Sequence, residues 1–300
     1  MLAELWRRPG GAYGLLVVVL VFAAAVVSLL WTPYPLLQQD VADKWQGPSL
    51  DHWLGTDQIG RDTFSWLLAG ARTTVFVSVL SAVIAGALGV VLGALGALTP
   101  RWVSEPLAVL VDILIAFPTL LIAMLFAASL GGSLWVVVAA VGIAGGVSIG
   151  RVVRPEIRIA DRSDFVLAAR AAGVRRARVI RRHVVPNVAP VVIVQISLIA
   201  AVAVLAEAGL SYLGYGAPAG TPSWGRSLAE SQRFIGVQPA AVLWPGLTIT
   251  LTVLGFSLLG DALREAVDPR LRRARAATDE DSPDRPPERR TAPVSVEVVS

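Results

Sequence analysis

Side chains that commonly do chemistry in proteins are scarce and scattered in this sequence. Cysteine is absent, and the two histidines, His52 and His183, lie far apart in the chain, so thiol and metal chemistry are not expected. Residues 146–150 match the G-x-S-x-G pattern of a hydrolase nucleophile elbow, but that pattern needs a preceding strand, and here it ends a long apolar stretch. No phosphate-binding GxxxxGKS or GxxxxGKT motif occurs. The sequence therefore predicts no catalytic residues and no bound cofactor or metal.

Two carboxylates, Asp112 and Glu207, stand in or at the edge of strongly apolar segments. An ionised carboxylate at the centre of a bilayer costs about 2.5–3.5 kcal/mol on insertion scales, so both groups should face protein or water. Asp112 could pair with an arginine such as Arg151 or Arg154, or it could line a substrate path. Glu207 precedes Gly209 at the outer end of its segment, where an interfacial and a functional position are both open.

The elements that must position these groups are membrane helices. The chain has 300 residues, of which 55% are hydrophobic and only 16% charged, with a mean hydropathy of +0.65; this is too apolar for a water-soluble domain. A helix needs roughly 20 apolar residues to cross a bilayer. Six such spans are predicted: 11–31, 73–99, two between 105 and 151 that turn at 130–133, and two near 188–208 and 240–260. We expect an all-α integral membrane protein.

The distribution of basic residues predicts the orientation of the spans. With the N-terminus inside, inner segments hold 21 of the 26 lysines and arginines and outer segments hold 5, as the positive-inside rule requires. Both termini are then cytoplasmic, and the chain is a multi-pass protein of the plasma (inner) membrane. A cleaved signal peptide over residues 1–31 is disfavoured because its apolar stretch exceeds the usual ~7–15 residues.

Glycines recur on single helix faces in two of the predicted spans. Such spacing lets helix backbones approach closely. We expect these glycines either to pack helices within the chain or to line an interface that slides during a working cycle. They are Gly86, Gly89, Gly93 and Gly96 in the second span and Gly142, Gly146 and Gly150 in the fourth.

The 151–187 segment is the only long inner loop between spans, and it predicts two helices. Ser163 or Asp164 can cap a helix over Phe165–Ala172, and Gly173 suits its end. Arg170 is the only charge in that helix. A helix this short and apolar is unstable in water without tertiary packing. We therefore expect another surface to cover it.

The second predicted helix of the loop is amphipathic and ends before Pro186. The loop could lie on anionic lipid headgroups or dock into a groove on a soluble partner, and only a partner explains the apolar first helix. The stripe of the second helix is Val174, Ala177, Ile180 and Val184, and its other faces carry Arg175, Arg176, Arg178, Arg181 and Arg182.

The run DFVLAARAAGVRRARVIRRHVVPNVAP at 164–190 resembles the EAA loop of ABC importer permeases. Leu167 stands where the family has its glutamate. Ala168, Ala169, Gly173, His183, Pro186 and Asn187 match the family pattern. The resemblance implies that contact with an ATPase involves Asp164, Phe165, Leu167, Ala168, Ala169, Arg170, Gly173, Arg176, His183 and Pro186.

Four further segments extend the resemblance to the C-type permease subunit of dipeptide, oligopeptide and nickel importers. These are HWLGTDQIGRD at 52–62, LAEAGLSYLGYG at 205–216, TPSWG at 221–225 and LGDALREAVDPRLRR at 259–273. The resemblance implies a six-helix type I permease fold with a cytoplasmic coupling helix. It also implies half of a translocation pathway for peptides, with nickel, glutathione-like compounds, sugars or other small solutes as alternatives.

The partners implied by the resemblance are a sister permease, two ABC ATPase subunits that use ATP and Mg, and an extracytoplasmic binding protein. Membrane lipid is also a partner and nucleic acid is not. A proton-coupled carrier would need ionisable groups at the bundle centre, and the spans offer only Asp112 and Glu207, both expected near span ends. A membrane scaffold or enzyme without transport is a third class.

The outer segments offer a docking surface for the binding protein. A helix that lies along the outer surface is predicted from residue 61 to the second span. Either this segment is a passive interfacial anchor, or its acidic rim docks the binding protein together with the 209–238 loop. The docking candidates are Asp57, Arg61, Asp62 and Trp224.

Four regions of the chain are expected. They are a cytoplasmic stub with the first helix (1–32), an extracytoplasmic segment with an interfacial helix (33–72), a five-helix core with the coupling loop (73–265), and a disordered cytoplasmic tail (266–300).

Overall fold

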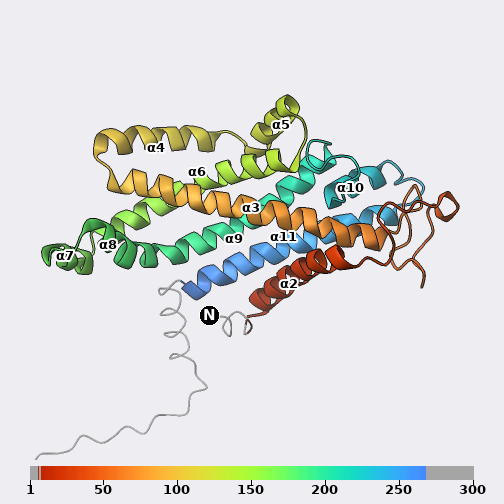
Figure 1. Ribbon diagram of the computed structural model, residues 1–300, viewed down its shortest axis with the longest axis horizontal. Helices are drawn as coiled ribbons and strands as arrows, with labels where there is room; N and C mark the ends of the chain where they lie inside the picture. The colour runs from red at the N-terminus through yellow and green to blue at the C-terminus, as the bar shows by residue number, and fades with distance from the viewer. Residues whose placement is uncertain (1–5, 7, 268–300) are drawn as a thin grey trace, which may run out of the picture.

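The computed structural model describes residue 6 and residues 8–267, and the regular elements in that part are all helices (Figure 1). The predicted tail lies almost entirely outside the described residues. The long helices are α2 (Pro9–Leu30), α3 (Thr63–Leu98), α6 (Leu134–Asp161), α9 (Val185–Tyr212) and α11 (Ala240–Val267). The shorter ones are η1 (Val41–Asp43), α4 (Arg101–Ala116), α5 (Thr119–Leu130), α7 (Asp164–Ala171), α8 (Arg176–Val179), η2 (Ile180–Val184) and α10 (Trp224–Gln232).

Five of the described helices are long and apolar enough to cross a membrane. The helices α4 and α5 pass the same test only when taken together, in the region of the third predicted span. They are bent by 80° at their junction, so this region is a broken span or a re-entrant loop in place of one uninterrupted helix. Pro118 explains the bend, because proline disfavours helical dihedrals in the residue before it, and Phe117 is extended there (φ −85°, ψ 130°). The predicted turn after this span is confirmed at Gly131, whose φ is +86°.

The N-terminal end of α3 differs from the prediction. Instead of a separate surface helix, residues 63–98 form one continuous helix. Asp62 caps its N-terminus and accepts a hydrogen bond from Ser65 N (2.8 Å). The charge of Arg72 suggested a boundary at 73. Arg72 is half-buried within the helix, where its Nε donates to Ser28 Oγ of α2 (2.7 Å).

The most extensive helix contact joins α3 to α6, and glycines make it possible. A Cβ on Gly89 would overlap Ile149 of α6, and one on Gly146 would lie 2.8 Å from Leu88 of α3. The predicted glycine faces therefore pack against each other within the chain, as expected for small residues at membrane helix interfaces. Gly86 is different because it faces Ile196 of α9.

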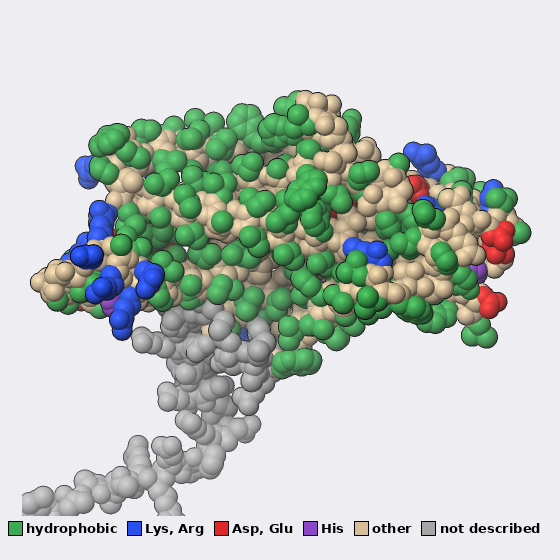
Figure 2. All heavy atoms as spheres, viewed as in Figure 1, with side chains coloured by type: hydrophobic (Ala, Val, Ile, Leu, Met, Phe, Trp, Pro, Cys, Tyr) green, Lys and Arg blue, Asp and Glu red, His purple; other side chains and the backbone are tan. Residues whose placement is uncertain are grey.

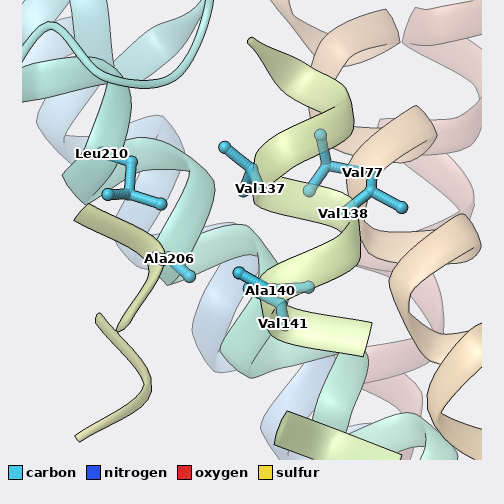
Figure 3. Close-up of a cluster of buried hydrophobic side chains, with 9 residues drawn as sticks. Val77, Val137, Val138, Ala140, Val141, Ala206 and Leu210 are labelled. Atoms are coloured by element: carbon cyan, nitrogen blue, oxygen red, sulfur yellow. The ribbon is translucent and has the colours of Figure 1, made fainter. Parts of the chain in front are cut away.

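A buried apolar cluster holds α3, α6 and α9 together. Figure 3 shows side chains from these three helices converging on one another. The labelled members are Val77 of α3, Val137, Val138, Ala140 and Val141 of α6, and Ala206 and Leu210 of α9. The central position of α6 fixes the two chain segments that leave its ends, which include the arginine-rich loop.

Candidate functional site

Charged side chains gather at the two ends of the molecule, and the apolar helices lie between them (Figure 2). We call the end formed by α7, α8 and η2 the arginine-rich end. Acidic side chains such as Asp40 and Asp51 are exposed in the segment before α3 at the opposite end. The exposed arginines of the first end are Arg170, Arg175, Arg176, Arg178, Arg181 and Arg182.

The helix α7 at the arginine-rich end confirms the predicted short helix to within one residue. Ser163 occupies the cap position, but its Oγ donates back to Ala160 O (2.6 Å) instead of binding the first turn. Gly173 ends the helix with φ +76°, a left-handed conformation that favours glycine. Its N–H donates to Arg170 O (2.9 Å). The turn at Gly173 thus sets the direction in which the chain leaves α7.

One face of α7 packs on the protein and the rest is uncovered. Val166 is fully buried against a cluster that includes Val179 and Val184. Phe165 and Leu167 are 47% and 51% exposed. The remaining predicted coupling residues of this helix, Asp164, Ala168 and Arg170, are also exposed, and Ala169 is half-buried.

Polar contacts hold α7 and the following segment to the bundle. Arg170 pairs with Asp161 at the end of α6. Arg176 Nη2 donates to Leu98 O at the end of α3 (2.8 Å). The rings of Phe165 and His183 lie 6.0 Å apart between centroids. These contacts place α7 in one position relative to α3 and α6.

The second predicted helix of the loop does not end before Pro186, so that expectation is wrong. Residues 176–212 form one continuous helical segment that contains a π-helical turn, η2. In this turn Val185 N–H donates to Ile180 O, and such local widening lets a helix in a membrane accept proline. The predicted apolar stripe is buried at Val184 but exposed at Ala177.

Asp112 forms the predicted ion pair with Arg151, with 3.6 Å between Oδ1 and Nε. Both side chains are more than half exposed. Sequence reasoning missed that Arg154 and Arg158 fasten α6 to the C-terminal end of α3, where both donate to Gly96 O at 3.0 Å. Their four-residue spacing on one helix face was the available signal.

Glu207 is fully buried and therefore faces protein, as expected for a carboxylate in an apolar segment. Its Oε1 accepts hydrogen bonds from Ser211 Oγ (2.7 Å) and from Ser223 Oγ (2.8 Å). Ser223 is the N-cap of α10. Glu207 therefore joins α9 to the start of α10. The Glu207–Ser211 spacing of four residues was a visible signal, whereas Ser223 comes close only in the folded chain.

The four docking candidates form internal contacts. Asp62 and Trp224 are 6% and 2% exposed, so neither provides a contact surface in this conformation. Asp62 Oδ1 lies 2.9 Å from Nδ1 of His52, and Trp224 Nε1 donates to Leu67 O (2.8 Å). Asp57 and Arg61 pair with each other (2.6 Å) and remain partly exposed.

Glycines in the short motifs at 52–62 and 221–225 occupy positions that no larger residue fits. Gly60 has φ +77°, and a Cβ there would overlap the carbonyl of Asp40. A Cβ on Gly225 would overlap the carbonyl of Ala208. These motifs thus bring the loop segments close to one another and to α9.

Fold and site together define a class of protein. The chain is a multi-pass α-helical membrane protein with an apolar helix exposed at its arginine-rich end. The G-x-S-x-G pattern lies inside α6, with helix on both sides, so it is not a nucleophile elbow, which needs a strand-to-helix turn.

The chain belongs to the family of binding-protein-dependent transport system inner membrane components, whose model matches residues 85–273. It is 36% identical over 269 residues to the dipeptide transport system permease protein DppC of Alkalihalophilus pseudofirmus, covering 90% of this chain and 88% of that protein. It is 33% identical over 260 residues to the oligopeptide transport system permease protein OppC of Bacillus subtilis, covering 87% and 85%. The glutathione transport system permease protein GsiD of Pectobacterium atrosepticum is 33% identical over 280 residues, covering 90% and 91%. The predicted membership of the ABC importer permeases is confirmed.

A solved structure confirms the fold. The match is a chain of the MetNI methionine ABC transporter in inward-facing conformations, with a TM-score of 0.56 and 15% identity. The match covers 68% of this chain and 96% of that one.

Proposed function

We propose that this chain forms half of the translocation pathway of an ATP-driven peptide importer. In this proposal a sister permease supplies the other half, two ABC ATPase subunits bind at the arginine-rich end, and an extracytoplasmic binding protein delivers peptides. The family and the names of the relatives support transport. This chain binds no cofactor, and ATP and Mg act in the partner subunits.

The observation that carries the ATPase contact is the uncovered apolar surface of α7. Phe165 and Leu167 are about half exposed at the tip of the molecule, and Val166 on the opposite face anchors the helix. Burying apolar side chains in a groove is favourable, and the surrounding arginines can pair with acidic groups on the groove rim. The arginine-rich end and both termini are then cytoplasmic, in agreement with the positive-inside rule.

In the proposed mechanism, closure of the ATPase pair on ATP displaces α7. The displacement passes into the continuous 176–212 helix, which packs on α3, α6 and α11. ATP binding thereby shifts the population between inward-open and outward-open bundles, because the ATPases bind nucleotide more tightly in one of the two states.

Site-specific crosslinking tests the ATPase contact. A photoreactive amino acid at Phe165 or Ala169 should yield adducts with an ATPase subunit in membranes, and one at Leu50, 96% exposed at the opposite end, should not. Adducts with phospholipid alone would overturn the proposal.

Gly173→Pro or Ala169→Asp should abolish uptake and leave membrane insertion intact, and normal transport by either variant would exclude the coupling role of α7.

Transport in vesicles tests the energy source and the substrate. We expect uptake of labelled di- or oligopeptides to need ATP and the co-expressed ATPases. Dependence on a proton gradient would instead indicate a secondary carrier. Uptake of nickel without uptake of peptides would show that the substrate is a metal ion and not a peptide.

Docking of the binding protein is proposed for the opposite end. The exposed carboxylates Asp40 and Asp51 and the partly exposed Asp57–Arg61 pair are its available polar contacts. Charge reversal at Asp51 should slow delivery by the binding protein without changing the intrinsic ATPase rate of the complex, and equal delivery rates would contradict this contact.

A further inference from the structure

A cavity of 340 Å³ opens between α4 and the packed pair α3 and α6. Its walls are of two kinds. Leu92 of α3 and Leu107, Ala108 and Val111 of α4 form an apolar wall, and α6 contributes Arg151, Arg154 and Arg158. Asp112 is the one carboxylate among the lining residues. The cavity lies beside the α3–α4 connection, at the same end of the molecule as α7 (Figure 1).

Positive charge in the cavity exceeds negative charge. Arg151 pairs with Asp112, which leaves Arg154 and Arg158 of the lining arginines. Their hydrogen bonds go to backbone carbonyls of Gly96 and Ser104. A carbonyl satisfies an N–H group but cancels no full charge, and a guanidinium has five N–H donors.

Two further arginines strengthen this excess. Arg101 at the start of α4 and Arg162 at the end of α6 act on Arg158 electrostatically, together with Arg154. Like charges gathered in one region repel one another. An anion with several acceptor oxygens, held between them, would relieve the repulsion and use the remaining donors.

The apolar wall distinguishes the anion that fits. A small inorganic ion gains nothing from contact with Leu92, Leu107 and Val111. An anionic phospholipid matches both walls, because its phosphate reaches the arginines while the first part of its acyl chains covers the leucines. Basic pockets between transmembrane helices commonly hold anionic headgroups.

We propose that this cavity binds the headgroup of one anionic phospholipid, with Arg154 and Arg158 as the phosphate ligands. The bound lipid bridges α4 to α6 next to the root of the coupling loop. Assignment to the inner leaflet rests on the proposed orientation, but binding itself does not. Loss of ATPase docking would therefore leave lipid binding intact.

The test is a lipid titration of the purified full-length chain by native mass spectrometry in mild detergent. The probes are phosphatidylglycerol, phosphatidylcholine and inorganic phosphate. One arginine near the surface contributes about 1 kcal/mol to anionic lipid binding, so Arg158→Gln should weaken phosphatidylglycerol binding about fivefold. Arg178→Gln, an exposed arginine at the same end that does not line the cavity, is the matched control and should change binding less than twofold.

A second variant keeps the test decisive if Arg158→Gln fails to fold. Ala108→Phe fills the apolar wall and leaves every charge in place, so it should also weaken phosphatidylglycerol binding. Equal binding of phosphatidylglycerol and phosphatidylcholine, or equal losses in Arg158→Gln and Arg178→Gln, would overturn the proposal. If inorganic phosphate displaced phosphatidylglycerol and Ala108→Phe bound phosphatidylglycerol as well as the unmodified chain, the ligand would be a free anion and not a lipid.

Discussion

Truncation of an exposed apolar side chain on α7 should weaken the binding of the ATPase subunit with little effect on the stability of the fold. Complete burial of a leucine side chain stabilises by about 1.5–3 kcal/mol. Leu167 is 51% exposed in the free chain, so a partner that covers it gains roughly 1 kcal/mol by the same scale. Leu167→Ala should therefore weaken ATPase binding about fivefold. The melting temperature should fall much less than for a fully buried side chain, because about half of the Leu167 surface is already in solvent.

The measurement is the Kd of the purified ATPase subunit for the permease in nanodiscs, together with the melting temperature of each variant. Val166→Ala is the matched control on the same helix. Val166 is fully buried, so the loss of about two methylene equivalents, ~1.6 kcal/mol before any cavity cost, should lower the melting temperature. An unchanged Kd for Leu167→Ala would refute the inference that a partner covers the exposed face of α7.

Three other substitutions test the packing and the joints. Gly89→Val should destabilise the chain by about 1–3 kcal/mol through overpacking and lower its melting temperature. Gly209→Ala should not, because a Cβ there meets no atom within 4 Å. Equal effects of the two substitutions would contradict the close α3–α6 contact. Glu207→Ala removes the acceptor of two buried hydroxyls and should cost at least ~1–3 kcal/mol, with faster hydrogen exchange at the start of α10; unchanged exchange there would exclude the joint. Gly173→Ala should cost about 1–2 kcal/mol from its left-handed dihedrals and increase exchange in α7 before α6 is affected; uniform exchange would disprove local strain.

The features that the sequence predicted well depend on local signals. The short helix α7 was predictable because the Ser163-Asp164 pair and Gly173 mark its two ends within ten residues. The glycines at helical spacing predicted that α3 and α6 each come close to another helix, although they did not say which helix that is. The ion pair between Asp112 and Arg151 followed from the cost of a lone charge in an apolar segment.

The features that the sequence did not predict depend on partners distant in the chain. Arg72 ended the predicted span because nothing nearby could satisfy it, whereas in the fold it reaches Ser28 of α2. Trp224 was expected to be available for docking, and no local signal showed that it is buried with its indole N–H on Leu67 O, 157 residues earlier.

Proline had different effects at two places, which local rules alone do not separate. Pro118 breaks a span at a point where α5 can turn away, while Pro186 is absorbed by a π-helical turn. At Pro186 the helix packs on neighbours on both sides of the turn, which makes continuation favourable.

The π-helical turn makes one rod of the 37 residues from Arg176 to Tyr212. At 1.5 Å per residue such a rod is about 55 Å long, enough to reach from the arginines at one tip to the Glu207 joint at the other. A tilt of about 10° around its midpoint would carry its two extremities roughly 5 Å in opposite directions, given that rise per residue. The two ends of this helix would then move together, so no relay of side chains between them would be needed.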